Sequence, residues 1–204
     1  MLKKLQKISN MKKLISIIVL SLFFVGNVSA EERESELNNL FKQLKNSEIT
    51  KAVKIENKIW KIWSTHPSDD KEGYKLTELL DRGSLLINSR KLNKAYEIFT
   101  QIIATDPNWS EAWNKRALVL YLMKQYQSSL DDIKKTLTLE PRHFGALSGQ
   151  ALNYIGLKEY EKAIRSYEQA QKIYPVIDGA KKMIPQLQEL INEQAVWNKY
   201  LLLF

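Results

Sequence analysis

The sequence predicts an all-α fold in which antiparallel pairs of helices stack on one another, with helical caps at both ends. The main observation is a fixed interval of 34 residues between equivalent positions in the middle of the chain. Sets of positions that keep this interval are Gly83/Ala117/Ala151, Leu92/Tyr126/Tyr160 and Pro107/Pro141/Pro175. The second observation is that apolar residues inside each interval recur three and four residues apart, as on one face of a helix. A fixed period that carries small, aromatic and proline residues in constant order is typical of a stacked helical repeat.

Each interval contains two helical runs separated by a short polar break. In the middle copy, Trp113, Ala117 and Leu120 mark the first run, and Tyr126 and Leu130 begin the second. Each run is roughly 14 residues, or about four turns. It carries one apolar stripe and cannot be stable alone in water, so neighbouring runs are expected to pack together. Small residues at the helix crossing allow close approach, and the prolines end each second helix.

The pattern resembles the tetratricopeptide repeat, whose period is the same. The matching residues are Gly83, Ala95, Phe99 and Pro107 in copy one, Trp113, Ala117, Tyr126 and Pro141 in copy two, and Ala151, Tyr154, Tyr160, Ala163, Tyr167, Ala170 and Pro175 in copy three. The predicted copies span 76–109, 110–143 and 144–177. Ile102, Thr136 and Ser129 depart from the family, which usually has alanine there. The resemblance implies a right-handed superhelical stack, whereas an ordinary helical bundle would explain the apolar stripes but not the interval.

The first thirty residues predict an export signal. A stretch with five lysines precedes an apolar run from Leu14 to Gly26, and small residues up to Ala30 precede the acidic Glu31. An apolar run of this length is too short to span a bilayer, which favours cleavage between Ala30 and Glu31 over a retained membrane anchor. Translation from Met11 in place of Met1 would leave a complete signal. The expected location is periplasmic or secreted, and the alternative is association with the inner membrane.

The net charge gives little support for nucleic-acid binding. The chain carries +8, but five of its 31 basic residues and none of its 23 acidic residues lie in residues 1–30. Removal of the signal would leave 26 basic side chains against 23 acidic ones, a net charge of +3. The chain has no cysteine, which excludes disulfides and thiol chemistry and agrees with a bacterial envelope protein.

The segments on either side of the repeats are predicted to be helical. Residues 31–67 carry two apolar stripes and would form an N-terminal cap or a degenerate repeat, followed by a polar connector over 68–74. Residues 178–204 would form a C-terminal capping helix, kinked or started near Pro185, and an apolar tail. In one interpretation the tail forms a buried stripe, and in the other it docks on a partner or a membrane. The residues of this stripe are Leu190, Trp197, Leu201 and Phe204.

No residue pattern predicts a catalytic, cofactor or metal site. His66 and His143 lie beside predicted helix boundaries, where packing or capping explains them, and neither has a second histidine at ligand spacing. No glycine-rich phosphate loop occurs. Asp132 is expected to pair with Arg116, which otherwise occupies an apolar column. The chain is therefore predicted not to be an enzyme.

The resemblance implies that the first helices line a concave groove, which would be mostly apolar here. The predicted groove residues are Leu80, Ser84, Asn114, Leu118, Tyr121, Leu122, Ser148, Leu152 and Ile155. Some family members grip a carboxylate with basic and amide side chains. The matching positions here are Leu80, Ser84, Lys115, Gly145 and Gly149, so that clamp is absent. An apolar groove favours a peptide or helix with hydrophobic anchors, unless the terminal segments fill it.

The function predicted from these features is a scaffold or protein-interaction module in the bacterial envelope. The alternative is an accessory or regulatory subunit of an envelope enzyme or assembly pathway. The partner would be another protein, with no cofactor and no nucleic acid. Membrane contact would run only through an uncleaved signal or the apolar tail.

Overall fold

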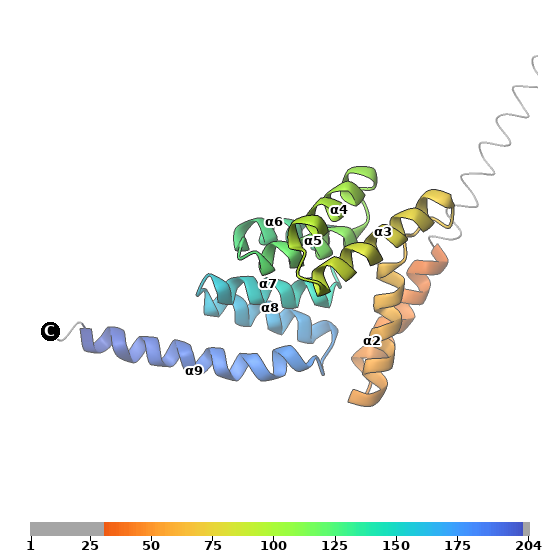
Figure 1. Cartoon of the computed structure of the whole chain (residues 1–204). Helices are drawn as coiled ribbons and strands as arrows, with labels where there is room; N and C mark the ends of the chain where they lie inside the picture. The colour runs from red at the N-terminus through yellow and green to blue at the C-terminus, as the bar shows by residue number, and fades with distance from the viewer. Residues whose placement is uncertain (1–30, 202–204) are drawn as a thin grey trace, which may run out of the picture. The chain divides into compact units, whose positions relative to one another are not determined.

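The computed structural model describes residues 31–201, which contain nine helices and no strand (Figure 1). Residues 31–45 form the first helix. The others are α2 (Ile49–Ser64), α3 (Lys71–Asn88), α4 (Leu92–Thr105), α5 (Ser110–Leu122), α6 (Tyr126–Leu139), α7 (Phe144–Gly156), α8 (Tyr160–Ile173) and α9 (Asp178–Leu201). The predicted all-α fold is confirmed. The predicted export signal, residues 1–30, lies outside the described residues.

The described residues fall into two compact units, divided between Asn39 and Leu40. In the first unit, residues 31–39 are helical. The second unit contains α2 to α9 and therefore all three repeats.

The repeats are the three helix pairs α3/α4, α5/α6 and α7/α8, which follow one another in chain order (Figure 1). A small residue lies where the two helices of a pair cross. In the first pair, a Cβ atom added to Gly83 would lie 2.6 Å from the ring of Phe99. Ala117 and Ala151 occupy the equivalent positions and are buried. Larger side chains there would overpack the core, so the small-residue column is a packing requirement.

Each pair buries an apolar core, and α9 covers the open face of the last one. Phe99 and Ile102 are fully buried in the first pair. In the third pair, Tyr167 packs with Ala180 and Leu187, which α9 contributes. A helix in this place gives the terminal repeat the neighbour that its apolar face requires.

Ser129, in an alanine column, and Arg116, in an apolar column, form polar contacts between helices. The hydroxyl of Ser129 donates to the carbonyl oxygen of Ala117 at 2.8 Å and accepts a hydrogen bond from Asn153 at 2.9 Å. Arg116 donates two hydrogen bonds to the carboxylate of Asp132, at 2.7 and 2.8 Å. This confirms the predicted ion pair. The bond to Asp132 raises the pKa of Arg116.

One helix boundary differs from the prediction. The segment 68–74 is not entirely a connector, because α3 already begins at Lys71. The carboxylate of Asp70 accepts a hydrogen bond from the amide of Gly73 at 2.8 Å and so caps the helix at this earlier point. At the other end of the chain, the predicted capping segment 178–204 contains α9, which starts at Asp178 and has Pro185 inside it.

The apolar stripe of α9 is not buried as the first interpretation expected. Leu190 is 41% exposed and Trp197 is 70% exposed, because the contacts of α9 with the third repeat run through Ala180 and Leu187, nearer its start. The side chains of Leu201 and Phe204 lie outside the described residues. Within residues 31–201 no helix combines the length and the apolar character that a membrane crossing requires.

Candidate functional site

Five of the nine predicted groove residues surround one cavity between α5 and α7. They are Asn114, Leu118, Tyr121, Ser148 and Leu152. The cavity has a volume of about 230 Å³, and Trp60 of α2 and Ile133 of α6 add to its apolar wall. Leu118 is 40% exposed and Tyr121 is half-buried, so both remain accessible from solvent.

The other four predicted residues do not line this cavity. Leu80 is 1% exposed and belongs to the core, because it lies on the face of α3 that packs against α4 and α5. Ser84 is half-buried and donates its hydroxyl to a carbonyl oxygen of its own helix. Ile155 packs against the core of the third pair, whereas Leu122 is exposed. The groove is therefore concentrated in the second and third repeats.

One end of the groove is covered by α2, which runs along the junctions between repeats. Glu56 accepts a hydrogen bond at 3.0 Å from the hydroxyl of Tyr174, at the end of α8. One turn later, Trp60 packs edge-on against Phe144, with 5.6 Å between ring centroids. A side chain at Gly145 would collide with the ring of Trp60, so this glycine allows α2 to approach α7. Burial and the bond to Glu56 raise the pKa of Tyr174 to about 12.

A buried histidine–glutamate pair fixes α2 against α5 and α7. The ring of Trp63 stacks on His143, with centroids 4.0 Å apart and 10° between the planes. Nδ1 of His143 accepts a hydrogen bond from the amide of Ala146 and so caps α7. The ring proton must then sit on Nε2, which donates to Glu111 at 2.9 Å. Both side chains of the pair are 0% exposed, so water cannot replace either partner.

The environment of Glu111 favours its ionised form in spite of burial. Burial alone raises the pKa of this carboxyl group. The hydrogen bond from His143 and the nearby Lys115 and Asn114 lower it by more, and the pKa ends below its ordinary value. Lys115 Nζ lies 3.3 Å from Oε1 of Glu111. The carboxylate of Glu111 is thus held inside the protein by three partners, His143, Lys115 and Asn114.

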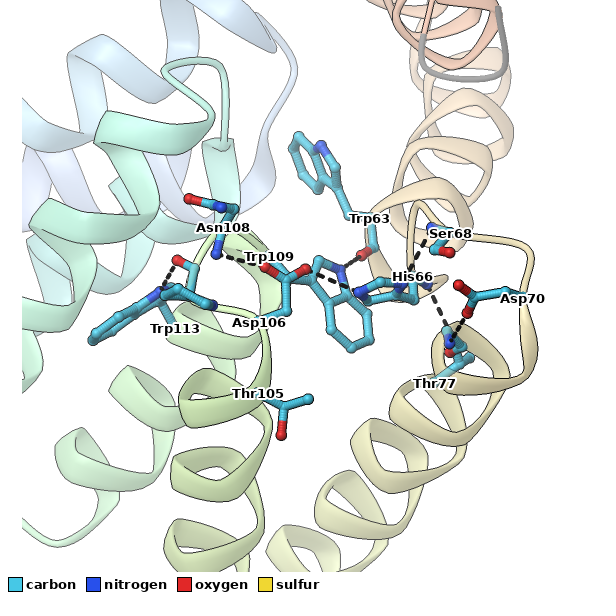
Figure 2. A network of polar contacts seen from close by, with 12 residues as sticks. Trp63, His66, Ser68, Asp70, Thr77, Thr105, Asp106, Asn108, Trp109 and Trp113 are labelled. Carbon is cyan, nitrogen blue, oxygen red and sulfur yellow. Dashed lines mark hydrogen bonds and ion pairs between the residues drawn. The ribbon is translucent and has the colours of Figure 1, made fainter. Parts of the chain in front are cut away.

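A second histidine–carboxylate pair joins the chain after α2 to the first repeat, as Figure 2 shows. Nε2 of His66 lies 2.9 Å from Asp106 at the end of α4. Nδ1 of His66 accepts a hydrogen bond from the amide of Ser68 at 3.1 Å, which again leaves Nε2 as the donor. Beside this pair, the indole of Trp109 donates to the carbonyl oxygen of Trp63 at 2.9 Å. Both histidines therefore hold helix ends in place, as capping and packing require.

The site is a binding surface. Within residues 31–201, no group of three histidine, cysteine or acidic side chains is placed to hold a metal ion. The positions of a carboxylate clamp carry one cation, Lys115. That cation is paired with Glu111 and lies 5.9 Å from the centroid of Trp60. None of these positions carries an unpaired basic side chain that could bind a carboxylate.

The sequence left open whether the terminal segments fill the groove, and it did not identify Trp60 of α2 as a groove residue. Trp60 and Trp63 are three residues apart on an apolar stripe, which fits any packed helix. Their partners, His143 and Glu111, lie far away in the sequence. The available signal was the aromatic stripe inside the predicted cap, residues 31–67, together with a histidine at a helix start and an acidic residue about one repeat earlier.

Comparison with known proteins agrees with the repeat pattern. The family model described as tetratricopeptide repeat matches residues 146–176. A TPR repeat-containing protein of Rhizobium etli is 31% identical over 170 residues, which is 80% of this chain and 81% of that protein. Hsp70-Hsp90 organizing protein 1 of Glycine max is 23% identical over 55% of this chain, which spans only 20% of that protein.

Solved structures share the fold. The first TPR domain of Spaghetti (RPAP3), determined with a bound HSP90 peptide, superposes with a TM-score of 0.56 at 18% identity. The match covers 58% of this chain and 94% of that domain. At this identity the likeness shows the helix arrangement alone.

Loss of the buried carboxylate should destabilise the protein. Glu111→Ala leaves the Nε2 proton of His143 buried without an acceptor, and we expect a loss of about 2–3 kcal/mol in the free energy of unfolding at pH 7. Because the folded pKa of Glu111 is lowered, its stabilisation is present above the unfolded value near 4.5 and is lost as the pH falls below it. The variant should therefore lose less stability than the wild type between pH 7 and pH 3. Urea unfolding, monitored by circular dichroism at pH 7 and at pH 3, measures the loss of stability and its dependence on pH.

The exposed Glu97 of α4 supplies the control. Glu97→Ala should change the free energy of unfolding by less than about 0.5 kcal/mol. Equal effects of the two substitutions would contradict the role assigned to Glu111.

Proposed function

Because the chain belongs to the tetratricopeptide repeat family, we propose that it is a non-catalytic interaction module that holds an apolar segment of a partner protein between α5 and α7. The observation that carries the proposal is the cavity formed by Leu118, Tyr121 and Leu152. Its volume of about 230 Å³ lies below the roughly 300 Å³ at which small-molecule sites begin. A space of this size suits one or two apolar side chains of a bound segment.

The chemistry of the groove favours hydrophobic anchors over a free carboxylate. Relatives and fold neighbours include a protein named for organizing Hsp70 and Hsp90, and a domain bound to an HSP90 peptide. A clamp for a C-terminal carboxylate requires unpaired basic side chains. In this chain Leu80 is buried and Gly145 and Gly149 carry no side chain, while Lys115 is held by Glu111. A partner is therefore recognised mainly through apolar contact.

We place this module in the bacterial cell envelope, as a scaffold that is exported and then cleaved. The support is the basic and apolar leader of residues 1–30, with small residues before Glu31. If export and cleavage occur, mass spectrometry of the protein recovered from the producing cells should find Glu31 as the first residue. A soluble protein in the cytoplasm that still begins at Met1 or Met11 would exclude this location.

Substitutions in the groove should abolish partner capture without unfolding the repeats. Apolar residues near the centre of an interface contribute most of its energy, so we expect Tyr121→Ala with Leu118→Ser to reduce capture at least tenfold. Immobilised protein is incubated with an envelope extract, and the bound proteins are identified and quantified by mass spectrometry. Circular dichroism verifies that the variant keeps its helix content.

The matched control is Lys134→Glu on α6, where the side chain is exposed and lies outside the cavity. It should leave capture unchanged. If the groove variant still captures the partner and the Lys134→Glu control does not, the binding surface lies on the second helices.

A further inference from the structure

The turn inside each repeat combines an unusual backbone conformation with a basic side chain. Arg90, Lys124 and Lys158 have φ values of 56°, 61° and 60°, and they are the described residues other than glycine with positive φ. They lie 34 residues apart. In each turn, the amides of this residue and the next bond to carbonyl oxygens at the end of the first helix. For Lys124 and Gln125 both distances are 2.8 Å.

Backbone geometry does not explain why these residues are basic. The left-handed conformation at a helix end favours glycine, since a Cβ atom there costs about 1–2 kcal/mol. A cation near a helix C-terminus gains only about 0.3–1 kcal/mol from the helix dipole. The gain does not exceed the cost, yet a cation occurs in all three turns. The repetition indicates that the side chains themselves have a role.

These cations form one positive edge of the stack, which we call the basic edge: Arg90, Lys91, Lys94, Lys124 and Lys158. All five are exposed, and none has an ion pair within residues 31–201. Three of them, with Met123, line a shallow depression of about 430 Å³. The helices that start at this edge add to its potential, because the N-cap residues Lys91 and Gln125 make no side-chain bond to the first turn. The edge weakens at the third repeat, where Glu159 pairs with Lys162.

The groove leads from α2 to the basic edge. Trp60 lines the cavity near the starts of α5 and α7, and the turns with Lys124 and Lys158 follow the ends of these helices. Leu118 precedes Lys124 by six residues, which is about 9 Å along a helix. An extended segment covers that distance in about three residues. A segment anchored beside Leu118 therefore reaches the basic edge within about three residues of its anchor.

We propose that the partner segment carries acidic residues about three positions from its apolar anchor, and that these carboxylates bind the basic edge at Lys124 and its neighbours. The inference rests on the proposed function of the groove and adds the charge and the direction of the bound segment. The apolar anchor supplies contact area, and the ion pairs fix the register and speed association.

An anionic bilayer fits the basic edge less well. A cation near such a surface contributes only about 1 kcal/mol, so stable binding needs an apolar anchor beside the charges. The apolar residues beside the turn cations of the second and third repeats are Leu122 and Leu157, which are only 43% and 37% exposed, and the residue before Arg90 is the polar Ser89. An acidic protein segment has its apolar anchor in the groove already, so it needs no further apolar contact beside the cations.

Two labelled peptides test the proposal on the full chain by fluorescence anisotropy. Both contain a Leu-Trp-Leu core; one continues with six glutamates and the other with six glutamines. At low salt we expect the glutamate peptide to bind about tenfold more tightly, and the difference to shrink at 0.5 M salt. The triple variant Arg90→Gly, Lys124→Gly and Lys158→Gly should remove the difference. Glycine suits the turn conformation, so this variant should melt no lower than the wild type.

A second triple variant removes the same number of charges from the second helices: Lys134→Gln, Lys135→Gln and Lys172→Gln. It should keep the preference for glutamate. If both peptides bind equally to the wild type, the inference fails, but the proposed function of the groove is still supported. If the glycine variant keeps the preference for the glutamate peptide, or if the wild type binds vesicles of anionic lipid but neither peptide, the inference also fails. If neither peptide binds, and the variant Tyr121→Ala with Leu118→Ser captures partners as well as the wild type does, both the inference and the proposed function fail.

Discussion

The arrangement of this protein depends on a histidine–glutamate pair buried beneath a tryptophan. His143 caps α7 with one ring nitrogen and donates to Glu111 of α5 with the other, while Trp63 of α2 stacks on its ring. A polar group without a partner is costly in a site that water cannot reach. Both α5 and α7 must therefore keep their places for the hydrogen bonds of the pair to form, and α2 covers the pair with the ring of Trp63. The same geometry recurs at His66 and Asp106, so two such pairs hold the segment around α2 to the repeats.

This attachment gives the groove two unlike ends. A regular stack of helix pairs is similar along both edges, since each repeat presents the same turns. Here α2 occupies the edge formed by the junctions between repeats, and Trp60 reaches into the cavity. The opposite edge carries the exposed cations at the turns within repeats. A bound segment consequently meets an aromatic wall on one side and positive charge on the other, which sets its direction.

The repeats themselves could be predicted from the sequence, and the placement of α2 could not. Gly83 and Ala117 mark helix crossings. They recur at the repeat interval, and only a small residue allows the two helices to pack at that position. The Arg116–Asp132 pair was also predictable, since the arginine interrupts an apolar column. Leu80 was assigned to the groove by its place in the repeat, but α5 covers it. The contacts of Trp60 and Trp63 join residues about 80 positions apart, and an apolar stripe does not reveal which surface it will cover.

Amide hydrogen exchange of α2 tests most directly whether the buried pair ties this helix to the repeats. If it does, the amides of residues 55–63 should be protected as strongly as those at the start of α7, because both helices open only when the Trp63–His143–Glu111 contacts break. The two sets should also lose protection together as urea is added. Exchange of residues 55–63 that is a hundredfold faster than exchange in α7, and independent of urea, would contradict this account.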